Sequence, residues 1–356
     1  MNQPDTSDRL ERVLVATDAP ISVALAQLDR AGTGALVFQD GNGGLAGLLT
    51  DGDIRRAILR GVPFDAACAK VATREPIRVT PDLSRAECLR LMNSYDVNHL
   101  PVVTADGILR GLLLRSDLMT EDDCVASAVI MAGGFGKRLL PLTEATPKPM
   151  LPVGDTPLLE RTIRRLSEAG IRQVSVTTHH LSDRITGYFG DGAGFGVDIN
   201  YIAEDHPLGT VGSLKRFPSA GGPILVINGD VLTGVQFRNL VAYHREQGAD
   251  ITVGVRRYEL EVPYGVVECE GPYLRRVEEK PRLHFLVNAG IYMLDRSVLR
   301  YIPADQRFDM TDLLGKLLEA GRPVVTFPVV EYWLDIGRPA DYEQAQRDLT
   351  EGRLTA

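Results

Sequence analysis

A glycine-rich segment with three basic residues is the part of the sequence whose residue types most directly suggest chemistry. It reads Gly-Gly-Phe-Gly-Lys-Arg from residue 133 and continues through Thr-Pro-Lys-Pro to residue 149. Glycines let the backbone turn tightly and bring its N–H groups close to an anion. Lys137, Arg138 and Lys148 add positive charge, the arginine as a fork for phosphate oxygens and the lysines as mobile point charges. The segment therefore predicts a polyphosphate-binding site.

The segment differs from two well-known glycine-rich phosphate motifs. It is not the G-x-G-x-x-G dinucleotide fingerprint, because Lys137 and Arg138 follow the third glycine and Pro141 interrupts any helix there. It also lacks the G-x-x-x-x-G-K-[ST] order of the phosphate-binding loop of many NTPases. A plain turn with solvated basic side chains is the alternative interpretation, but it leaves the downstream Thr-Pro-Lys-Pro run unexplained.

Two carboxylates far apart in the sequence are candidate metal ligands. Asp230 follows the apolar run 223–227 in the order Asn-Gly-Asp, and Asp335 lies in the run Tyr-Trp-Leu-Asp-Ile-Gly. A carboxylate just past a buried strand is either a helix cap or a ligand. Two carboxylates together with triphosphate oxygens would suit Mg²⁺, which keeps several waters and prefers few protein ligands.

The elements expected around these residues alternate between strand and helix. Apolar or β-rich runs over residues 125–132, 173–177 and 223–227 predict strands. Residues 157–169, 237–244 and 311–318 have helical periodicity, and the first of these has Pro at its start and Gly at its end. This order predicts a Rossmann-like α/β domain with a mostly parallel sheet. Ligands of such sheets lie beyond the carboxyl ends of the strands, where the glycine-rich segment and Asp230 are expected.

The first third of the chain contains an internal repeat. Residues 47–54 align with residues 111–118, and residues 35–38 align with residues 100–103. Each copy reads as helix, strand, turn, strand and helix. A unit this small has little core of its own, so two copies are expected to bury their open sheet faces against each other. The acidic stretch 120–124 predicts the boundary, which gives domains over residues 1–121 and 125–356.

The repeat resembles a tandem pair of α+β cystathionine-β-synthase-type (CBS) domains. The runs GLLTDGDIRRAI and NHLPVV…GLLLRSDLM carry the resemblance. It implies an AMP, ADP or ATP ligand, held by a hydroxyl and a carboxylate in T-x-x-D spacing, and a homo-oligomer formed through the pair. Thr50 and Asp53 have that spacing, whereas the second copy keeps Asp117 but has Leu114 in place of the hydroxyl residue. The alternative is that Asp53 and Asp117 only cap helices and that the pair only packs and dimerises.

Composition and charge narrow the possible classes of protein. The chain has 356 residues, 39 of them basic and 47 acidic, for a net charge of −8. The length favours two domains, and the acidic balance argues against a nucleic-acid partner. The four cysteines form no C-x-x-C pair, so a zinc ribbon or a redox motif is not expected. Without a signal peptide or an apolar run of about 18 residues, we expect a cytoplasmic protein with no membrane insertion.

The second domain resembles the sugar-1-phosphate nucleotidyltransferase family. The string GGFGKRLLPLTEATPKPMLPV carries the resemblance, and EDHPLGTVGSL, INGD, VEEKP, VNAGIYML and EYWLDIGRP follow in the family's order over residues 125–350. The resemblance implies transfer of a nucleotidyl group from an NTP to a sugar 1-phosphate, with Mg²⁺ as cofactor and release of pyrophosphate.

The resemblance also implies a role for individual residues. Asp230 and Asp335 would hold Mg²⁺, and His179 and His180 are interpreted as the structural edge of the cleft. Residues implied in catalysis are Arg138, Lys148 and Lys280. Residues implied in nucleotide binding are Ala132, Gly133, Gly134, Gly136, Lys137, Glu204, Gly209 and Thr210. Residues implied in sugar binding are Gly265, Glu278 and Asn288.

Alternatives remain for the base, for the sugar and for the activity itself. The sequences of the motifs are most similar to those of guanylyltransferases. The order of a CBS pair followed by a short transferase is similar to that of the glucosamine-1-phosphate guanylyltransferases of legionaminic acid synthesis. We therefore expect GTP and a hexosamine 1-phosphate. The alternatives are a uridylyl- or thymidylyltransferase, an inactive nucleotide-sensing protein, and a dinucleotide-binding oxidoreductase.

Overall fold

The computed structural model describes residues 7–95, 97–118, 126–179, 181–204, 208–217 and 221–354. The predicted boundary at residues 120–124, and His180, lie outside these ranges. Contacts divide the chain into two units, Met1–Val125 with Arg238–Gly248, and Ala126–Phe237 with Ala249–Ala356. The segment 238–248 therefore groups with the first unit, although its sequence falls inside the second predicted domain. Among the described residues, no helix is long and apolar enough to cross a membrane.

The first unit is built from two copies of a helix–hairpin–helix repeat. The first copy contains α1 (Ser7–Val13), α2 (Ile21–Ala31), β1 (Ala35–Gln39), β2 (Leu45–Thr50), α3 (Asp51–Leu59) and the short 3₁₀ helix η1 (Cys68–Lys70). The second contains α4 (Arg85–Ser94), β3 (His99–Val103), β4 (Leu109–Leu114) and α5 (Arg115–Leu118). Leu36 pairs with Leu49 in the first hairpin and Leu100 pairs with Leu113 in the second, and all four are fully buried. The repeat seen in the sequence is thus also a repeat of core positions.

A seven-stranded sheet forms the centre of the second unit. Its strands are, in spatial order, β16 (Val324–Pro328), β12 (Ile251–Glu261), β15 (Arg282–Leu294), β10 (Ile224–Asn228), β5 (Ser127–Met131), β8 (Gln173–Thr178) and β9 (Asp198–Ala203). All neighbours are parallel except that β15 runs antiparallel to β12 and β10. The predicted mostly parallel α/β sheet is therefore confirmed.

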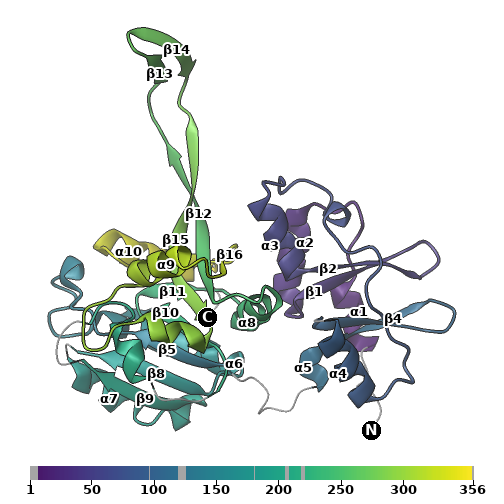
Figure 1. Cartoon of the computed structure of the whole chain (residues 1–356), viewed down its shortest axis with the longest axis horizontal. Coiled ribbons are helices and arrows are strands. Elements are labelled where there is room, and N and C mark those ends of the chain that lie inside the picture. The colour runs from purple at the N-terminus through teal and green to yellow at the C-terminus, as the bar shows by residue number, and fades with distance from the viewer. Residues whose placement is uncertain are drawn as a thin grey trace. The chain divides into compact units, whose positions relative to one another are not determined.

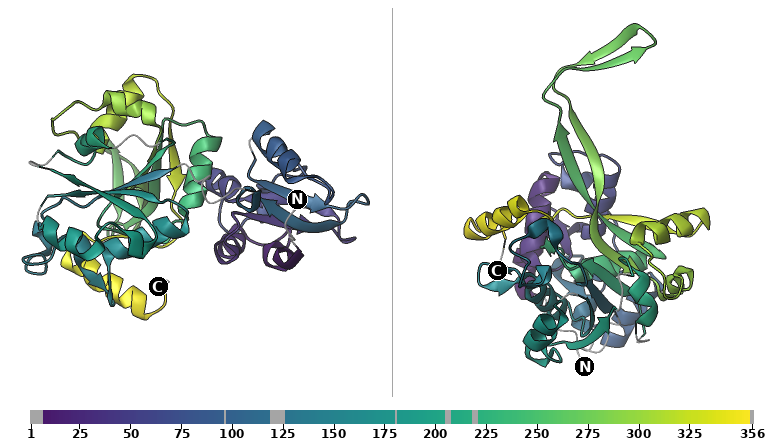
Figure 2. Two further views of the ribbon diagram at one scale, coloured as in Figure 1. Left: turned by 90° about the horizontal axis from the view of Figure 1, so that it is seen from below. Right: turned by 90° about the vertical axis from the view of Figure 1, so that its left-hand side faces the viewer.

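Helices cover both faces of this sheet (Figure 2). The helices of this unit are α6 (Leu158–Glu168), α7 (Ser182–Phe189), α9 (Met310–Glu319) and α10 (Pro339–Thr350), whereas α8 (Phe237–Glu246) lies in the segment that groups with the first unit. On one face, Met310, Leu313 and Leu317 of α9 share a core cluster with Val226 and Ile251 of the sheet. Short 3₁₀ segments connect the elements: η3 (Lys137–Leu139), η4 (Lys148–Met150), η5 (Ala193–Phe195), η6 (Gly212–Arg216) and η7 (Arg296–Tyr301). The predicted helices over 157–169, 237–244 and 311–318 correspond to α6, α8 and α9.

Three small ribbons complete the second unit. Strands β6 (Pro152–Val153) and β7 (Thr156–Pro157) form one, and β11 (Val231–Thr233) and β17 (Trp333–Asp335) form another. Strands β12 and β15 continue beyond the sheet as a long two-stranded projection that ends in the hairpin β13 (Val266–Glu270) and β14 (Tyr273–Glu278) (Figure 1). We call residues 257–286 the arm. The strand and helix pattern of the sequence did not predict it.

Candidate active site

The glycine-rich segment starts at the carboxyl end of β5, near the middle of the sheet. The Ala132 N–H donates a hydrogen bond of 3.0 Å to Thr177 Oγ1 at the end of the neighbouring strand β8. Gly136 has a φ of 61°, and a Cβ added there would lie 3.0 Å from Thr143 Cγ2 and 3.2 Å from Lys148 Cβ. Only glycine fits this left-handed and crowded position without strain. The turn therefore places the basic residues at the end of the strand.

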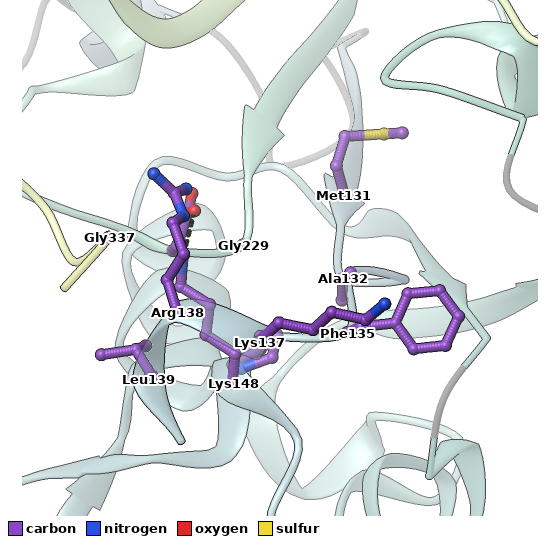
Figure 3. A pocket seen from close by; sticks show the side chains of 13 residues that line it. Met131, Ala132, Phe135, Lys137, Arg138, Leu139, Lys148, Gly229 and Gly337 are labelled. Atoms are coloured by element: carbon purple, nitrogen blue, oxygen red, sulfur yellow. Dashed lines mark hydrogen bonds and ion pairs between the residues drawn. The ribbon is translucent and has the colours of Figure 1, made fainter. Parts of the chain in front are cut away.

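A cavity of about 300 Å³ opens at this edge of the sheet. It is formed by the glycine-rich segment, the start of η4, the turn after β10 and the turn after β17 (Figure 3). A volume of this size accommodates a small-molecule ligand. The predicted site residues that line it are Ala132, Gly134, Gly136, Lys137, Arg138, Lys148 and Asp230.

The three cations of the segment lie in different surroundings within the cavity. Lys148 Nζ is 2.5 Å from Asp230 Oδ2, and the side chains of both residues are largely buried. The guanidinium of Arg138 lies beside Gly337, where an added Cβ would be 3.6 Å from one of its terminal nitrogens. Lys137 Nζ lies 5.4 Å from the centre of the Phe135 ring (Figure 3). The cations thus surround a space in which a polyphosphate can be neutralised.

The two predicted metal ligands are held on one ribbon. Asp230 directly precedes β11, and Asp335 is the last residue of β17, where it pairs with Val231. The Ile336 N–H donates a hydrogen bond of 3.0 Å to the backbone oxygen of Asp230. Burial raises the pKa of the Asp335 carboxyl, and the negative charge of Asp230 raises it further. The structure therefore brings these carboxylates together.

The donors at this point fit Mg²⁺ with a bound polyphosphate. In the described part of the chain, no group of three or more histidine, cysteine or acidic residues could hold a metal ion by itself. Two carboxylates suit a hard cation that takes its remaining ligands from phosphate oxygens and water. The residues that could hold the ion are therefore Asp230 and Asp335.

Glu204 lies next to Gly133 of the glycine-rich segment. A Cβ added at Gly133 would be 3.6 Å from Glu204 Oε2 and 3.5 Å from His179 Cβ. His179 Nδ1 lies 2.6 Å from the backbone oxygen of Glu204, so His179 supports the position of this residue. Burial raises the pKa of the Glu204 carboxyl.

Gly209 and Thr210 do not line the cavity. Gly209 has a φ of 80°, and a Cβ added there would be 2.6 Å from the backbone oxygen of Phe308. The Thr210 N–H donates to Asp309 Oδ1 at 3.0 Å, and Thr210 Oγ1 accepts a hydrogen bond of 2.7 Å from the Met310 N–H. In this structure the two residues anchor their loop to the start of α9.

The residues implied in sugar binding, and Lys280, which is implied in catalysis, do not line the cavity either. Gly265, Glu278 and Lys280 lie on the arm and are exposed. Asn288 is exposed near the base of the arm, where its Oδ1 accepts a hydrogen bond of 3.0 Å from the Gly290 N–H. Their implied roles remain predictions.

In the first unit, the predicted adenine-nucleotide residues are engaged with other groups. Thr50 Oγ1 accepts a hydrogen bond from the Asp53 N–H and lies 2.8 Å from Asp53 Oδ2, so the two residues form a capping box at the start of α3. Asp117 accepts hydrogen bonds from Arg9 at 2.6 and 2.9 Å and from the Leu114 N–H at 2.9 Å. These contacts are the capping role that the sequence left open as the alternative.

Six cavity residues were not assigned a role from the sequence: Met131, Phe135, Leu139, Pro149, Gly229 and Gly337. Gly229 must be glycine, because a Cβ there would be 2.8 Å from the backbone oxygen of Met131. Gly337 borders the guanidinium of Arg138, and Phe135 makes an edge-on ring contact with His179 at 5.2 Å. Gly229 directly precedes Asp230, and Gly337 lies two residues after Asp335, so proximity to a predicted ligand was the available signal.

Comparisons with known proteins agree with this arrangement. The family model described as nucleotidyl transferase matches residues 127–352, and the CBS domain model matches residues 11–60 and 68–123. The chain belongs to the nucleotidyl transferase family. It also carries a tandem pair of CBS domains, as the repeat predicted. This membership removes the dinucleotide-binding oxidoreductase from the alternatives.

Curated relatives within the family have different nucleotides in their names. A mannose-1-phosphate guanylyltransferase of Mycobacterium tuberculosis is 33% identical over 234 residues, which are 63% of this chain and 65% of that protein. A UTP–glucose-1-phosphate uridylyltransferase of Synechocystis sp. is 35% identical over 241 residues, 62% of each chain. The chain thus spans slightly less than two thirds of the length of these relatives.

A solved structure shares the fold of the second unit. A Bacillus anthracis protein, assigned as a glucose-1-phosphate thymidylyltransferase and crystallised with sucrose, superposes with a TM-score of 0.50 at 26% identity. The match covers 62% of this chain and 94% of that protein.

Proposed function

We propose that the chain transfers a nucleotidyl group from an NTP to a sugar 1-phosphate and releases pyrophosphate. The observation that carries this proposal is the ion pair between Lys148 and Asp230 in a cavity that also contains the glycine-rich turn and Arg138. Both curated relatives described above are named for such a transfer.

The proposed chemistry needs positioning and charge neutralisation rather than covalent catalysis. An oxygen of the sugar phosphate is already an anion and attacks the α-phosphorus in line, so no general base is needed. Backbone N–H groups of the glycine-rich turn and Arg138 would bind the β- and γ-phosphates that leave as pyrophosphate. Asp230 and Asp335 would hold Mg²⁺, which supplies charge screening and polarisation of the phosphorus. Lys148, next to Asp230, would neutralise the phosphate at which substitution takes place.

The preferred substrates within this proposal are GTP and a hexosamine 1-phosphate. The guanylyltransferase names among the relatives support the guanine base. The uridylyltransferase relative supports the alternative that the chain uses UTP or dTTP. The test is pyrophosphate release in a matrix of the four NTPs and dTTP against several sugar 1-phosphates. Turnover with GTP above all others supports the first choice, and no turnover with any pair favours a nucleotide-sensing protein.

A regulatory role of the CBS pair is a second part of the proposal. Thr50 and Asp53 stand at the start of α3 in the spacing that would hold a phosphate and a ribose. A nucleotide phosphate would have to compete with the capping box for Thr50 Oγ1, so binding is expected to shift the start of this helix. Calorimetric titration of the full chain with AMP and ATP tests this, with a Thr50→Val variant as the comparison. Equal heats for both proteins, or none, would contradict it.

A further inference from the structure

A second cavity lies in the second unit, apart from the cavity that contains the glycine-rich segment. Its volume is about 150 Å³, and among the described residues the two cavities share no lining residue. It is bordered by the helix α6, the start of β7, the strand β11 and Leu354. Sites for drug-sized ligands have volumes of roughly 300–1,000 Å³, so an occupant of this cavity would be small.

Positive charge is concentrated around this second cavity. The described residues that line it include three arginines of α6, Arg161, Arg164 and Arg165, and one acidic residue, Glu168. The whole chain, in contrast, has a net charge of −8. In an acidic protein, several cations around one hollow favour an anionic ligand there.

Backbone oxygens hold the guanidinium groups of Arg161 and Arg165 in place. Arg161 Nη2 donates a hydrogen bond of 2.8 Å to the Val153 oxygen of β6. Arg165 Nη2 donates one of 2.6 Å to the Gly234 oxygen after β11. A carbonyl oxygen carries no net charge, so these bonds orient the side chains without neutralising them. Side chains that are oriented in advance lose less conformational entropy when a ligand binds.

Arg161 lacks a direct ionic partner in the described part of the chain, whereas Arg164 is paired with Glu160 at 2.7 Å. The Arg161 Nε is buried and has no hydrogen-bond partner among the described residues. Burial lowers the pKa of the Arg161 guanidinium, although the negative charge of Glu160 acts in the opposite direction. A partly buried cation in these surroundings would be stabilised by a bound counterion.

A hydroxyl group is also available in this cavity. Thr156 lines it, and its side chain forms no hydrogen bond with the described residues. Thr233 lines it as well, but its Oγ1 donates to the Tyr332 oxygen. Guanidinium N–H groups and a hydroxyl from separate elements can surround the oxygens of a phosphate group, which point in several directions.

We propose that this second cavity is a binding site for a small phosphate-bearing anion. Arg161 and Arg165 bind the phosphate oxygens as charged forks, and the Thr156 hydroxyl donates to the same group. Leu232 and Phe237 also line the cavity, and their apolar side chains suit the carbon atoms of a small phosphate ester.

The site lies on elements that also lead to the Lys148–Asp230 pair. Thr233 belongs to β11, which begins directly after Asp230. Arg161 is bonded to β6, which follows η4 and its Lys148. The proposed ligand nevertheless binds outside the cavity of the proposed reaction. The inference therefore goes beyond the proposed function, and its test needs no turnover.

Binding of inorganic phosphate and of glycerol 3-phosphate to the full chain tests the proposal. The parent chain carries Arg138→Ala, which removes the arginine of the other cavity, and EDTA removes divalent cations. NaCl keeps the ionic strength constant, so that screening does not differ between samples. Broadening of the phosphorus NMR signal of each ligand measures its binding. The ligand that binds more tightly shows whether the phosphate group is that of the free ion or of an ester.

Three substitutions in this parent chain distinguish the cavity from general electrostatic attraction. Arg161→Gln is expected to weaken binding about tenfold or more, because it removes a charged donor to the phosphate. Thr156→Val is expected to weaken it several-fold, because it removes the hydroxyl and keeps the shape of the side chain. Arg184→Gln on α7 is the matched control, since it removes one positive charge from an exposed side chain outside the lining and should leave binding unchanged.

The proposal is overturned if the parent chain binds neither ligand or if Arg161→Gln binds them as the parent does. A loss in Arg184→Gln as large as that in Arg161→Gln would also overturn it, because the attraction would then be general. Circular dichroism checks the fold of each variant, and Thr156→Val decides in place of Arg161→Gln if the latter does not fold. Succinate that competes more strongly than either phosphate ligand would overturn the assignment to phosphate.

Discussion

Lys148 Nζ lies 2.5 Å from Asp230 Oδ2, so a lysine of the glycine-rich segment and a carboxylate beyond β10 form one charged unit. The residues come from segments that the sheet brings together, because β5 and β10 are adjacent parallel strands. A cation in direct contact with this carboxylate fixes its orientation. The pair can therefore respond as a unit when a phosphate enters the cavity.

Replacing Lys148 by Ala is expected to lower turnover by roughly two to three orders of magnitude, because it removes a fixed cation from the transition state. The fold should persist, since the substitution takes a charge out of a solvent-connected cavity. Pyrophosphate release measures the first effect and circular dichroism the second. Lys215→Ala is the matched control, because Lys215 Nζ donates only to the Leu299 backbone oxygen in an exposed position. A Lys148→Ala rate near that of this control would contradict the assigned role.

Asp230→Asn and Asp335→Asn are each expected to raise the Mg²⁺ concentration needed for half-maximal rate and to lower the maximal rate about 100-fold or more. Amide oxygens bind a hard cation less tightly than carboxylates do. A titration of the rate with MgCl₂ gives both values. Unchanged Mg²⁺ dependence in both variants would exclude these residues as the ligands.

Gly136→Ala is expected to destabilise the second unit and to reduce turnover together. A residue with a Cβ costs about 1–2 kcal/mol at a positive φ, and here the added atom also presses on Thr143 and Lys148. Chemical denaturation measures the loss of stability, and kcat reports the displacement of Lys148. Gly134→Ala is the control for stability only, since a Cβ there meets no atom within 4 Å. Equal stability of the two variants would show that the turn tolerates a side chain.

The first unit is expected to lose stability in mild acid because of His99 in β3. Burial lowers its pKa from 6.5 to about 4, and its Nε2 lies 3.0 Å from the Thr33 backbone oxygen. As the pH falls, the unfolded chain protonates this imidazole at a higher pH than the folded chain does. The contribution of neutral His99 to the free energy of unfolding is therefore intact above pH 6.5. It falls as the pH drops toward 4, by at most about 3 kcal/mol.

Thermal unfolding at a series of pH values measures this effect. A His99→Gln variant should lose less stability between pH 6.5 and pH 4.5 than the parent chain. Parallel losses in the two proteins would assign the acid sensitivity to other groups.

The sequence predicted those parts of the molecule whose signals are local or repeated. The buried strands and the amphipathic helices α6, α8 and α9 carried clear periodicity, and the repeat disclosed the CBS pair. The rule that ligands gather at the carboxyl ends of parallel strands placed Asp230 beside the glycine-rich segment, whereas its pairing with Asp335 rested on the donor set that suits Mg²⁺ and on the family resemblance. What joins them, the pairing of β11 with β17, involves strands of three residues each and is too short to leave a pattern.

The sequence did not predict the arm or the hydrogen bonds of the loop that contains Gly209. Alternation along residues 257–261 is as clear as in any strand, but the sequence does not say that the strand leaves the sheet. Gly209 and Thr210 share a motif with Glu204, but the sequence does not show that Thr210 forms hydrogen bonds with Asp309 and Met310. Both depend on contacts between residues far apart in the sequence, which composition and spacing do not encode.

The ribbon of β11 and β17 also sets an order of events during synthesis. The glycine-rich segment and Asp230 leave the ribosome long before Trp333–Asp335, and the two carboxylates meet only after those last residues have paired with Val231–Thr233. A nascent chain therefore carries its basic residues and Asp230 well before the second predicted metal ligand, Asp335, can join them.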